Sequence, residues 1–465
     1  MSVVFPNARN FSVSNSSFAN VGGDYIHYSG KGQDYPGLDV LYQYTVQGAF
    51  YDSEQRFPSP NCHPGTRSQV LEILRHWTNT DVADRTSIYW LYGAAGMGKS
   101  AFAREDPSRN SLSSFFITIS YQLATSSALT PLLKDSIDRT VRDTPGIIHA
   151  NLEEQFRAVI VSPCNSLTAE QWNSLPRLIV IDGLDECIDI ASQERLLSII
   201  CQAKTAALPL PFKFLICSRP EPRIWDAFRH QDLHSMLDCH DIGESFESGK
   251  DIAKYLIDNF GRIRQEHGWG MAHATEDWPG NVIIQQLVQK ACGQFIYATT
   301  VIKYVGCHDS FPIERLEIIL KITMPKDFDS PYPDLDLLYM QILSVCAERE
   351  LVLDVMAHIL SPRDILFTAH CVGTSARIIE GLFFLAKRKV WALLFRLHSV
   401  LRIPENDSDD ITVRHASFVD FLTDQKRSGK YFVNIDESAQ HERVVLHFLR
   451  MISESTINES KYFKQ

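Results

Sequence analysis

The chain has 465 residues, which is long enough for about two to four folding units of ordinary size. Hydrophobic residues make up 45% and charged residues 22% of the sequence, a composition that excludes wholesale disorder. The formal net charge of −11 disfavours a protein that mainly coats nucleic acid or an anionic membrane. A small basic pocket for one phosphate-bearing ligand remains compatible with that charge.

No stretch predicts a membrane span. The richest apolar stretch, residues 381–401, is interrupted by four cations, whereas a span needs about 20 nearly uncharged residues. The N-terminus lacks the basic and apolar regions of a signal peptide. We therefore place the chain in the cytoplasm, without a membrane or nucleic acid as partner.

The ten cysteines are scattered without a CxxC pair, which indicates reduced thiols rather than a disulfide framework. Cys62–His63 and Cys239–His240 resemble metal-ligand pairs. Tetrahedral zinc needs four suitably spaced ligands, so we interpret both pairs as a buried thiol beside a chance histidine.

Residues 1–60 are rich in Ser, Asn, Gly and Tyr and predict no function. Thr66 and Gln69 then suggest a capping box for a helix. The helix is indicated by an apolar stripe at helical spacing, formed by Val70, Ile73, Leu74 and Trp77. A short β-prone run over 88–92 leads directly into Gly93.

Two further apolar runs, 178–181 and 212–217, predict strands, and the first has the composition of a strand buried on both faces. Helical patterns over 152–160 and 194–204 lie between the runs. Strands that alternate with helices predict a parallel α/β sheet. Beyond about residue 240 the apolar spacing becomes mainly helical, with a possible hairpin over 401–414.

Residues 93–100, Gly-Ala-Ala-Gly-Met-Gly-Lys-Ser, fit the phosphate-loop pattern GxxxxGK[ST]. Glycines let successive main-chain amides point at phosphate oxygens, which assigns binding to Gly93, Ala94, Ala95, Gly96, Met97 and Gly98. Lys99 supplies a positive charge for the β and γ phosphates, and the hydroxyl of Ser100 is a ligand for Mg²⁺. The expected ligand is ATP or GTP with Mg²⁺.

Three groups follow the other two strands. Asp182 ends an apolar strand and would hold Mg²⁺, and Asp185 or Glu186 could orient the attacking water as general base. Arg219 follows the third strand and can reach the γ phosphate. An equally good reading makes Arg219 a surface residue paired with Glu221.

Together these motifs resemble the NACHT domain of the STAND class of signalling NTPases, fungal type, also described as nephrocystin-3-like N-terminal domains. The resemblance covers about residues 48–430. It rests on six segments: CHPGTR at 62–67, WLYGAAGMGKSA at 90–101, LIVIDGLDEC at 178–187, FLICSRPE at 214–221, CGQFIYATTV at 292–301 and HASFVDFL at 415–422.

The resemblance implies an α/β fold with a parallel P-loop NTPase sheet of ASCE type, followed by helical and winged-helix-like segments. It places an N-terminal segment over 1–60, the NTPase domain over 61–240, a helical domain over 241–325, a winged-helix-like domain over 326–430 and a helical tail over 431–465. In this family a histidine of the winged-helix-like segment contacts the bound diphosphate, and His415 matches it. The residue could equally be a helix cap.

The region after Ser100 departs from the family. Relatives continue the phosphate-loop helix and add a strand, whereas here Arg104 runs directly into a segment with Pro107. Either a natural deletion or skipped coding sequence explains the gap. The missing strand is the outer one beside 178–181, so we expect that apolar edge to be bare.

Three functions are compatible with these features. The first is a nucleotide-dependent switch with slow ATP or GTP hydrolysis that engages protein partners or itself. The second is a non-catalytic interaction scaffold derived from such an NTPase. The third, a P-loop kinase or DNA-dependent motor, is disfavoured by the acidic charge and by the lack of an arginine-rich lid.

Overall fold

The structure is a computed structural model. It describes residues 35–46, 50, 62–80, 86–94, 96–97, 112–186, 190–205, 210–229, 236–243, 248–268, 271, 274–307, 311–323, 330–346, 348–360 and 373–435. The chain divides into two compact units. One contains the described residues up to Thr45 together with Phe116–Ser166, and the other contains the rest of the described chain.

The first unit is helical. It contains α1 (Pro36–Gln43), most of α3 (Phe115–Thr125), α4 (Thr130–Asp143), α5 (Leu152–Phe156), a π-helical turn (Arg157–Val161) and α6 (Ser162–Asn165). The buried carboxylate of Asp138 accepts hydrogen bonds from the main-chain N–H groups of Gly37 and Leu38, at 2.8 and 3.1 Å. This contact satisfies donors that the first turn of α1 leaves open, so it fixes α1 against α4.

The second unit begins with a four-stranded parallel sheet. Its strands are β1 (Ile88–Tyr92), β2 (Leu178–Asp182), β3 (Lys213–Ser218) and β4 (Leu237–Asp241), in the order β2-β3-β1-β4. The expected α/β class with a parallel sheet is confirmed, and most other described residues are helical. We did not predict β4, whose polar sequence LDCHD lacks the apolar run of the other strands.

Strand β2 is not buried on both faces as its composition suggested. Leu178 and Val180 are 42% and 43% exposed, whereas Ile179 and Ile181 are buried. β2 is an edge strand of the described sheet, while β3 lies between two neighbours and is buried along its length. Leu178 and Val180 lie on one face of β2, so their exposure leaves the expectation of a bare apolar edge a prediction.

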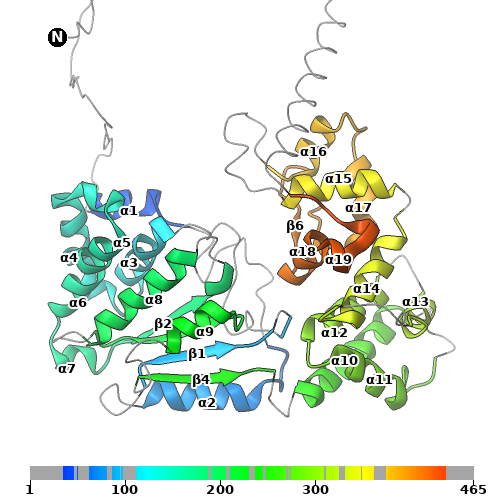
Figure 1. The fold of residues 1–465 in the computed structure, drawn as a ribbon, viewed down its shortest axis with the longest axis horizontal. Helices are drawn as coiled ribbons and strands as arrows, with labels where there is room; N and C mark the ends of the chain where they lie inside the picture. The colour runs from blue at the N-terminus through cyan, green and yellow to red at the C-terminus, as the bar shows by residue number, and fades with distance from the viewer. Residues whose placement is uncertain are drawn as a thin grey trace, which may run out of the picture. The chain divides into compact units, whose positions relative to one another are not determined.

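Helices cover both faces of the central strands (Figure 1). On one face, α2 (Ser68–Asn79) packs Val70, Leu74 and Trp77 against side chains of β1 and β3. On the other face, Trp90 contacts α9 (Pro222–Arg229) through two aromatic rings, with centroid distances of 4.8 Å to Trp225 and 4.7 Å to Phe228. Short helices η8 (Leu184–Glu186) and α7 (Ala169–Trp172), and α8 (Ile190–Thr205), complete this part.

The capping box expected for α2 is wrong. The helix begins at Ser68, and its N-cap, Arg67, has a left-handed conformation with φ of 60° and no side-chain cap. The Thr66 hydroxyl donates instead to the main-chain carbonyl of His63 at 2.7 Å. Arg67 is therefore held in an unusual backbone conformation by contacts elsewhere.

The second half of this unit is helical, as predicted. It contains α10 (Ser248–Glu266), α11 (Asn281–Ala291), α12 (Phe295–Val305), α13 (Pro312–Leu320), α14 (Pro333–Ser344), α15 (Arg349–Leu360), α16 (Ala376–Leu382), α17 (Lys389–Leu394), α18 (Ala416–Thr423) and α19 (Gln425–Ser428). The expected hairpin is confirmed as β5 (Leu401–Arg402) and β6 (Thr412–Val413), and these elements, apart from α19, contribute side chains to one apolar core.

A buried ion pair joins α14 to α19 within this core. Arg427 donates from Nε and Nη2 to the two carboxylate oxygens of Asp336, at 3.0 and 2.7 Å. Asp336 is 0% exposed, so the pair is shielded from water, and removal of one partner would leave a buried charge. Within the described residues, no helix has the length and apolarity to cross a membrane.

Candidate functional site

The candidate residues expected at the strand ends all lie at the carboxyl ends of the parallel strands, which we call the sheet edge. Gly93 follows β1, Asp182 ends β2 and Arg219 follows β3. Asp182 lies opposite Cys217 of β3, and Tyr92 of β1 lies opposite Ser218, so all three strands end at the same level. Ligands bind beyond the carboxyl ends of parallel strands, and this edge is therefore the candidate site.

The phosphate loop is described at Gly93, Ala94, Gly96 and Met97, and Ala95, Gly98, Lys99 and Ser100 lie outside the described residues. Gly96 has a φ of 80°, and a Cβ added to it would lie 2.1 Å from Ile296 Cγ2. The Ile296 N–H donates to the Gly96 carbonyl at 3.1 Å. Only glycine fits here, because the loop lies directly against the start of α12.

Arg67 is a contact of this loop that the sequence analysis missed. Its Nη2 donates to the Met97 carbonyl at 2.5 Å, and its guanidinium lies 4.8 Å from the centre of the Phe295 ring. Its main-chain N–H donates to the Asp251 carboxylate on α10 at 2.9 Å. Arg67 is only 4% exposed, and burial lowers the pKa of its guanidinium. Arg67 thus fixes the position of the Met97 carbonyl within the loop.

Arg219 is held by a carboxylate from each of two directions. Asp185 accepts the Arg219 main-chain N–H at 2.9 Å and its Nε at 3.1 Å. On the other side Arg219 Nη1 pairs with Asp420 of α18 at 2.9 Å. Arg219 thus joins the end of the sheet to the helical half. The sequence analysis, which paired Arg219 with Glu221 in its second reading, did not predict Asp420 as a partner.

Of the two acidic residues after β2, Asp185 and Glu186, only the side chain of Asp185 lies within the described residues. Asp185 is nearly buried and uses both carboxylate oxygens on Arg219. Glu186 ends the short helix η8, and its side chain lies outside the described residues. The general-base assignment is therefore untested for both residues.

His415 is the N-cap of α18. Its Nδ1 accepts the main-chain N–H of Ser417 at 3.0 Å and lies 2.7 Å from the Ser417 hydroxyl. His415 also lines a small cavity together with Ile296, the residue that contacts Gly96. The cap reading is thus correct.

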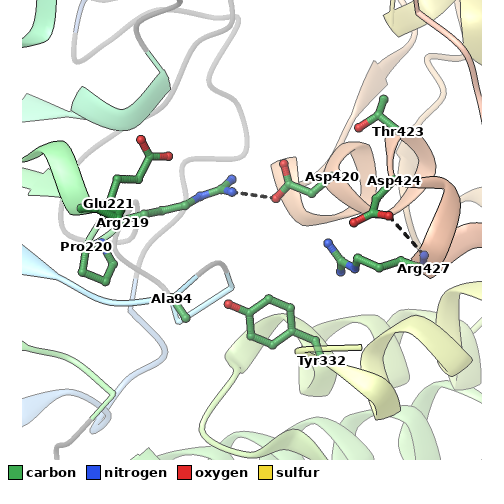
Figure 2. A pocket seen from close by; sticks show the side chains of 10 residues that line it. Ala94, Arg219, Pro220, Glu221, Tyr332, Asp420, Thr423, Asp424 and Arg427 are labelled. Atoms are coloured by element: carbon green, nitrogen blue, oxygen red, sulfur yellow. Dashed lines mark hydrogen bonds and ion pairs between the residues drawn. The ribbon is translucent and has the colours of Figure 1, made fainter. Parts of the chain in front are cut away.

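A cavity of about 540 Å³ opens beside Ala94 and Arg219 (Figure 2). Its other lining residues are Pro220, Glu221, Pro222, Tyr332, Asp420, Thr423, Asp424 and Arg427. Burial and then the nearby Asp185 charge raise the pKa of Glu221. Two guanidinium groups facing three carboxylates make a polar cavity, in which an added phosphate would compete with the carboxylates for the cations.

Metal ligation rests on few described groups. Asp182 offers hard carboxylate oxygens of the kind that Mg²⁺ prefers. No described set of three His, Cys, Asp or Glu residues could hold a metal ion. Cys62 is partly exposed and Cys239 is exposed, so the expectation that both thiols are buried is wrong. His63 instead bonds Asp258 at 2.8 Å.

The comparisons with known proteins give one family similarity. Residues 101–219 match the family described as Nephrocystin 3, N-terminal, and no curated protein matches the chain. Among solved structures, Drosophila ORC bound to DNA aligns with a TM-score of 0.25 and 11% identity, over 87% of this chain and 96% of that chain, which carries no argument about fold. The stretch from just after the phosphate loop to Arg219 is thus similar to a nephrocystin-3 N-terminal domain, as the motifs suggested.

Proposed function

We propose that this protein is a nucleotide-dependent switch of the NACHT type, within the STAND class of P-loop NTPases. It binds ATP or GTP with Mg²⁺ and hydrolyses the nucleotide slowly. The observation that carries the proposal is the meeting of Gly93, Asp182 and Arg219 at one edge of a parallel sheet. The helical half with its β5–β6 hairpin corresponds to the helical and winged-helix-like segments of that class.

Different residues bind different parts of the nucleotide and its metal ion. Main-chain amides of the phosphate loop and the ammonium of Lys99 hold the phosphates, and Gly96 permits the close backbone approach. Ser100 and Asp182 hold Mg²⁺, which neutralises charge on the phosphate oxygens when bound. His415 lies near the loop and contacts the diphosphate in the closed state.

Arg219 provides the switch. Its guanidinium is paired with Asp420, and a γ phosphate at the sheet edge would compete for the same cation. Asp185 orients Arg219 through two hydrogen bonds, so we assign it a positioning role and assign the general base to Glu186. Loss of the γ phosphate returns Arg219 to Asp420, which restores the link between the sheet and α18.

Calorimetric titration of the full chain with ATP and GTP, each with Mg²⁺, tests the proposal. Lys99→Ala should weaken binding at least about tenfold, or about 1.4 kcal/mol. Lys321→Ala is the matched control, because Lys321 is exposed and, among the described residues, pairs with Glu317 of α13. If Lys99→Ala binds as tightly as the control, the switch proposal is wrong.

A non-catalytic scaffold is the second candidate, favoured by the short segment between Ser100 and Pro107. Members of the family that the motifs resemble continue the phosphate-loop helix there, and a shorter helix would support the loop less. Steady-state hydrolysis separates the two candidates. Turnover that disappears in Glu186→Gln eliminates the scaffold, whereas undetectable turnover with intact nucleotide binding favours it.

A further inference from the structure

The ring of His398 lies between two main-chain carbonyls of the helical half. Its Nε2 is 2.9 Å from the carbonyl oxygen of Lys303 in α12, and its Nδ1 is 3.1 Å from the carbonyl oxygen of Phe395. A carbonyl oxygen only accepts hydrogen bonds, and a neutral imidazole has a single N–H group. Both contacts are therefore hydrogen bonds only when each ring nitrogen carries a proton. In the neutral ring, one nitrogen lone pair would face a carbonyl oxygen.

The position of His398 at the end of α12 also favours a positive charge. Lys303 is one of the last four residues of α12, whose carbonyls have no donor within the helix. These carbonyls form the negative end of the helix dipole, which attracts a cation. His398 is partly buried, so water screens this attraction less than it would at an exposed site.

The charged groups around the ring act in both directions. They are Lys303 of α12, Cys307 in the turn after it, Cys346 after α14, Arg396 on the same segment as His398, and Arg414 after β6. The cations oppose protonation, whereas the Cys307 sulfur, 3.9 Å from Nδ1, can accept from a protonated ring. Burial lowers the pKa of His398, and the contacts with Cys307 and the two carbonyls raise it by more, so the pKa lies above its ordinary value.

Helix α12 connects this ring to the phosphate loop. At its other end the Ile296 N–H donates to the Gly96 carbonyl at 3.1 Å. The helix has 11 residues and is therefore about 16 Å long. A helix moves largely as one body, so a contact that fixes its C-terminal end also limits the movement of its N-terminal end.

We propose that protonated His398 is a pH-sensitive clamp, which holds the C-terminal end of α12 against the segment 395–398 and thereby stabilises the contact of α12 with the phosphate loop. Deprotonation removes one of the two hydrogen bonds and the favourable charge at the helix end. The clamp consists of contacts within the chain, so it is independent of nucleotide binding. A chain that binds no nucleotide would lose the proposed switch and keep the clamp.

Titration of the full chain labelled with ¹³C at Cε1 of its histidines measures the protonation by NMR. His398→Gln identifies the signal of His398 by its disappearance, and His398→Asn serves the same purpose. The midpoint should lie above about 6.5, the value of an unperturbed histidine. Cys307→Ala keeps both carbonyls, so its midpoint should fall but stay above about 6.5. A midpoint at or below that value in either protein overturns the clamp.

Hydrogen exchange of the Ile296 amide tests whether the clamp reaches the phosphate loop. At the same pH, below about 6.5, His398→Gln should exchange this amide about fivefold faster than the wild type, because glutamine carries no charge. A raised pKa in the folded state gives stability below the unfolded pKa and loses it as the pH rises through the folded value. The ratio of the two rates should therefore fall toward one through the midpoint measured for His398.

Two features of the comparison isolate His398. Lys303, whose own pKa is lowered by burial to about 8, is present in both proteins, so its titration cancels in the ratio. His76→Gln removes an exposed histidine of α2 and should give a ratio of about one at every pH. An Ile296 exchange ratio for His398→Gln that stays at one, or that does not change with pH, overturns the proposal.

Discussion

Among the contacts that join the phosphate-loop side of the described chain to its helical half, those of Arg67 and of Arg219 differ in burial. Arg67 is buried, and it reaches Met97, Asp251 and Phe295 at once. The Arg219–Asp420 pair is partly exposed, with side chains 28% and 32% accessible. A buried cation cannot leave its partners without a large penalty, whereas a partly exposed pair is worth little and can exchange partners. The first link therefore suits a fixed support, and the second suits a switch.

The largest expected effect is on the fixed link. Asp251→Ala removes the acceptor of the Arg67 N–H and leaves a buried cation uncompensated. The free energy of unfolding should fall by about 3 kcal/mol, measured by denaturant titration. Asp258→Ala on the same helix removes only an exposed carboxylate and should lower it by at most about 1 kcal/mol. Equal losses would show that burial does not distinguish the two positions.

Arg67 itself should affect ligand binding through the loop. Arg67→Met keeps most of the stem but frees the Met97 carbonyl. Triphosphate affinity should fall about tenfold, because the loop amides are then less well oriented. Arg67→Lys should restore part of that affinity while the affinity for the free nucleoside stays unchanged in both variants. A loss shared equally by nucleoside and triphosphate would contradict this positioning role.

The exposed link should respond in the opposite direction. Asp420→Asn removes one partner of Arg219 and should change the free energy of unfolding by no more than about 1 kcal/mol. Because Arg219 is released toward the sheet edge, triphosphate affinity should rise severalfold with little change for diphosphate. Asp226→Asn, an exposed carboxylate of α9, is the control. Unchanged discrimination between the two nucleotides would count against Arg219 as the switch.

The smallest effect concerns Glu221, whose pKa is raised chiefly by burial. A carboxyl with a raised pKa in the folded state contributes stability below its unfolded pKa and loses it as the pH rises through the folded value. Glu221→Gln should therefore become more stable relative to the wild type as the pH rises through that range, by less than about 1 kcal/mol. Denaturant titrations across acidic to neutral pH measure the difference, and a constant difference contradicts the assignment.

Much of the sheet and the helical half could be predicted from sequence. The runs over 88–92, 178–181 and 212–217 became β1, β2 and β3, and the hairpin over 401–414 became β5 and β6. Strand β4 was not predicted, because its half-exposed position as an edge strand tolerates polar residues and gives no apolar run. The prediction that Leu178 and Val180 are buried was wrong, because an apolar run does not indicate how many neighbours its strand will have.

The residues of the candidate site could likewise be predicted from sequence only in part. Local motifs indicated the phosphate-loop residues, Asp182 and Arg219 as candidate site residues, since glycine spacing and strand ends are properties of short segments. The proposed domain boundaries stay a prediction. The partners of those residues depended on contacts across the fold: Arg67 with Met97, and Arg219 with Asp420.

The sequence by itself determined that a glycine-rich loop follows one strand of a parallel sheet and that carboxylates follow another. Only the tertiary structure decided which cations are compensated and which are not. Arg219 pairs with Asp185 and with Asp420, which is 201 positions further along the chain, whereas the charged neighbour of Lys303 is another cation, Arg414. Electrostatic energy depends on distance and burial in the folded state, and neither is encoded in the spacing of two distant residues.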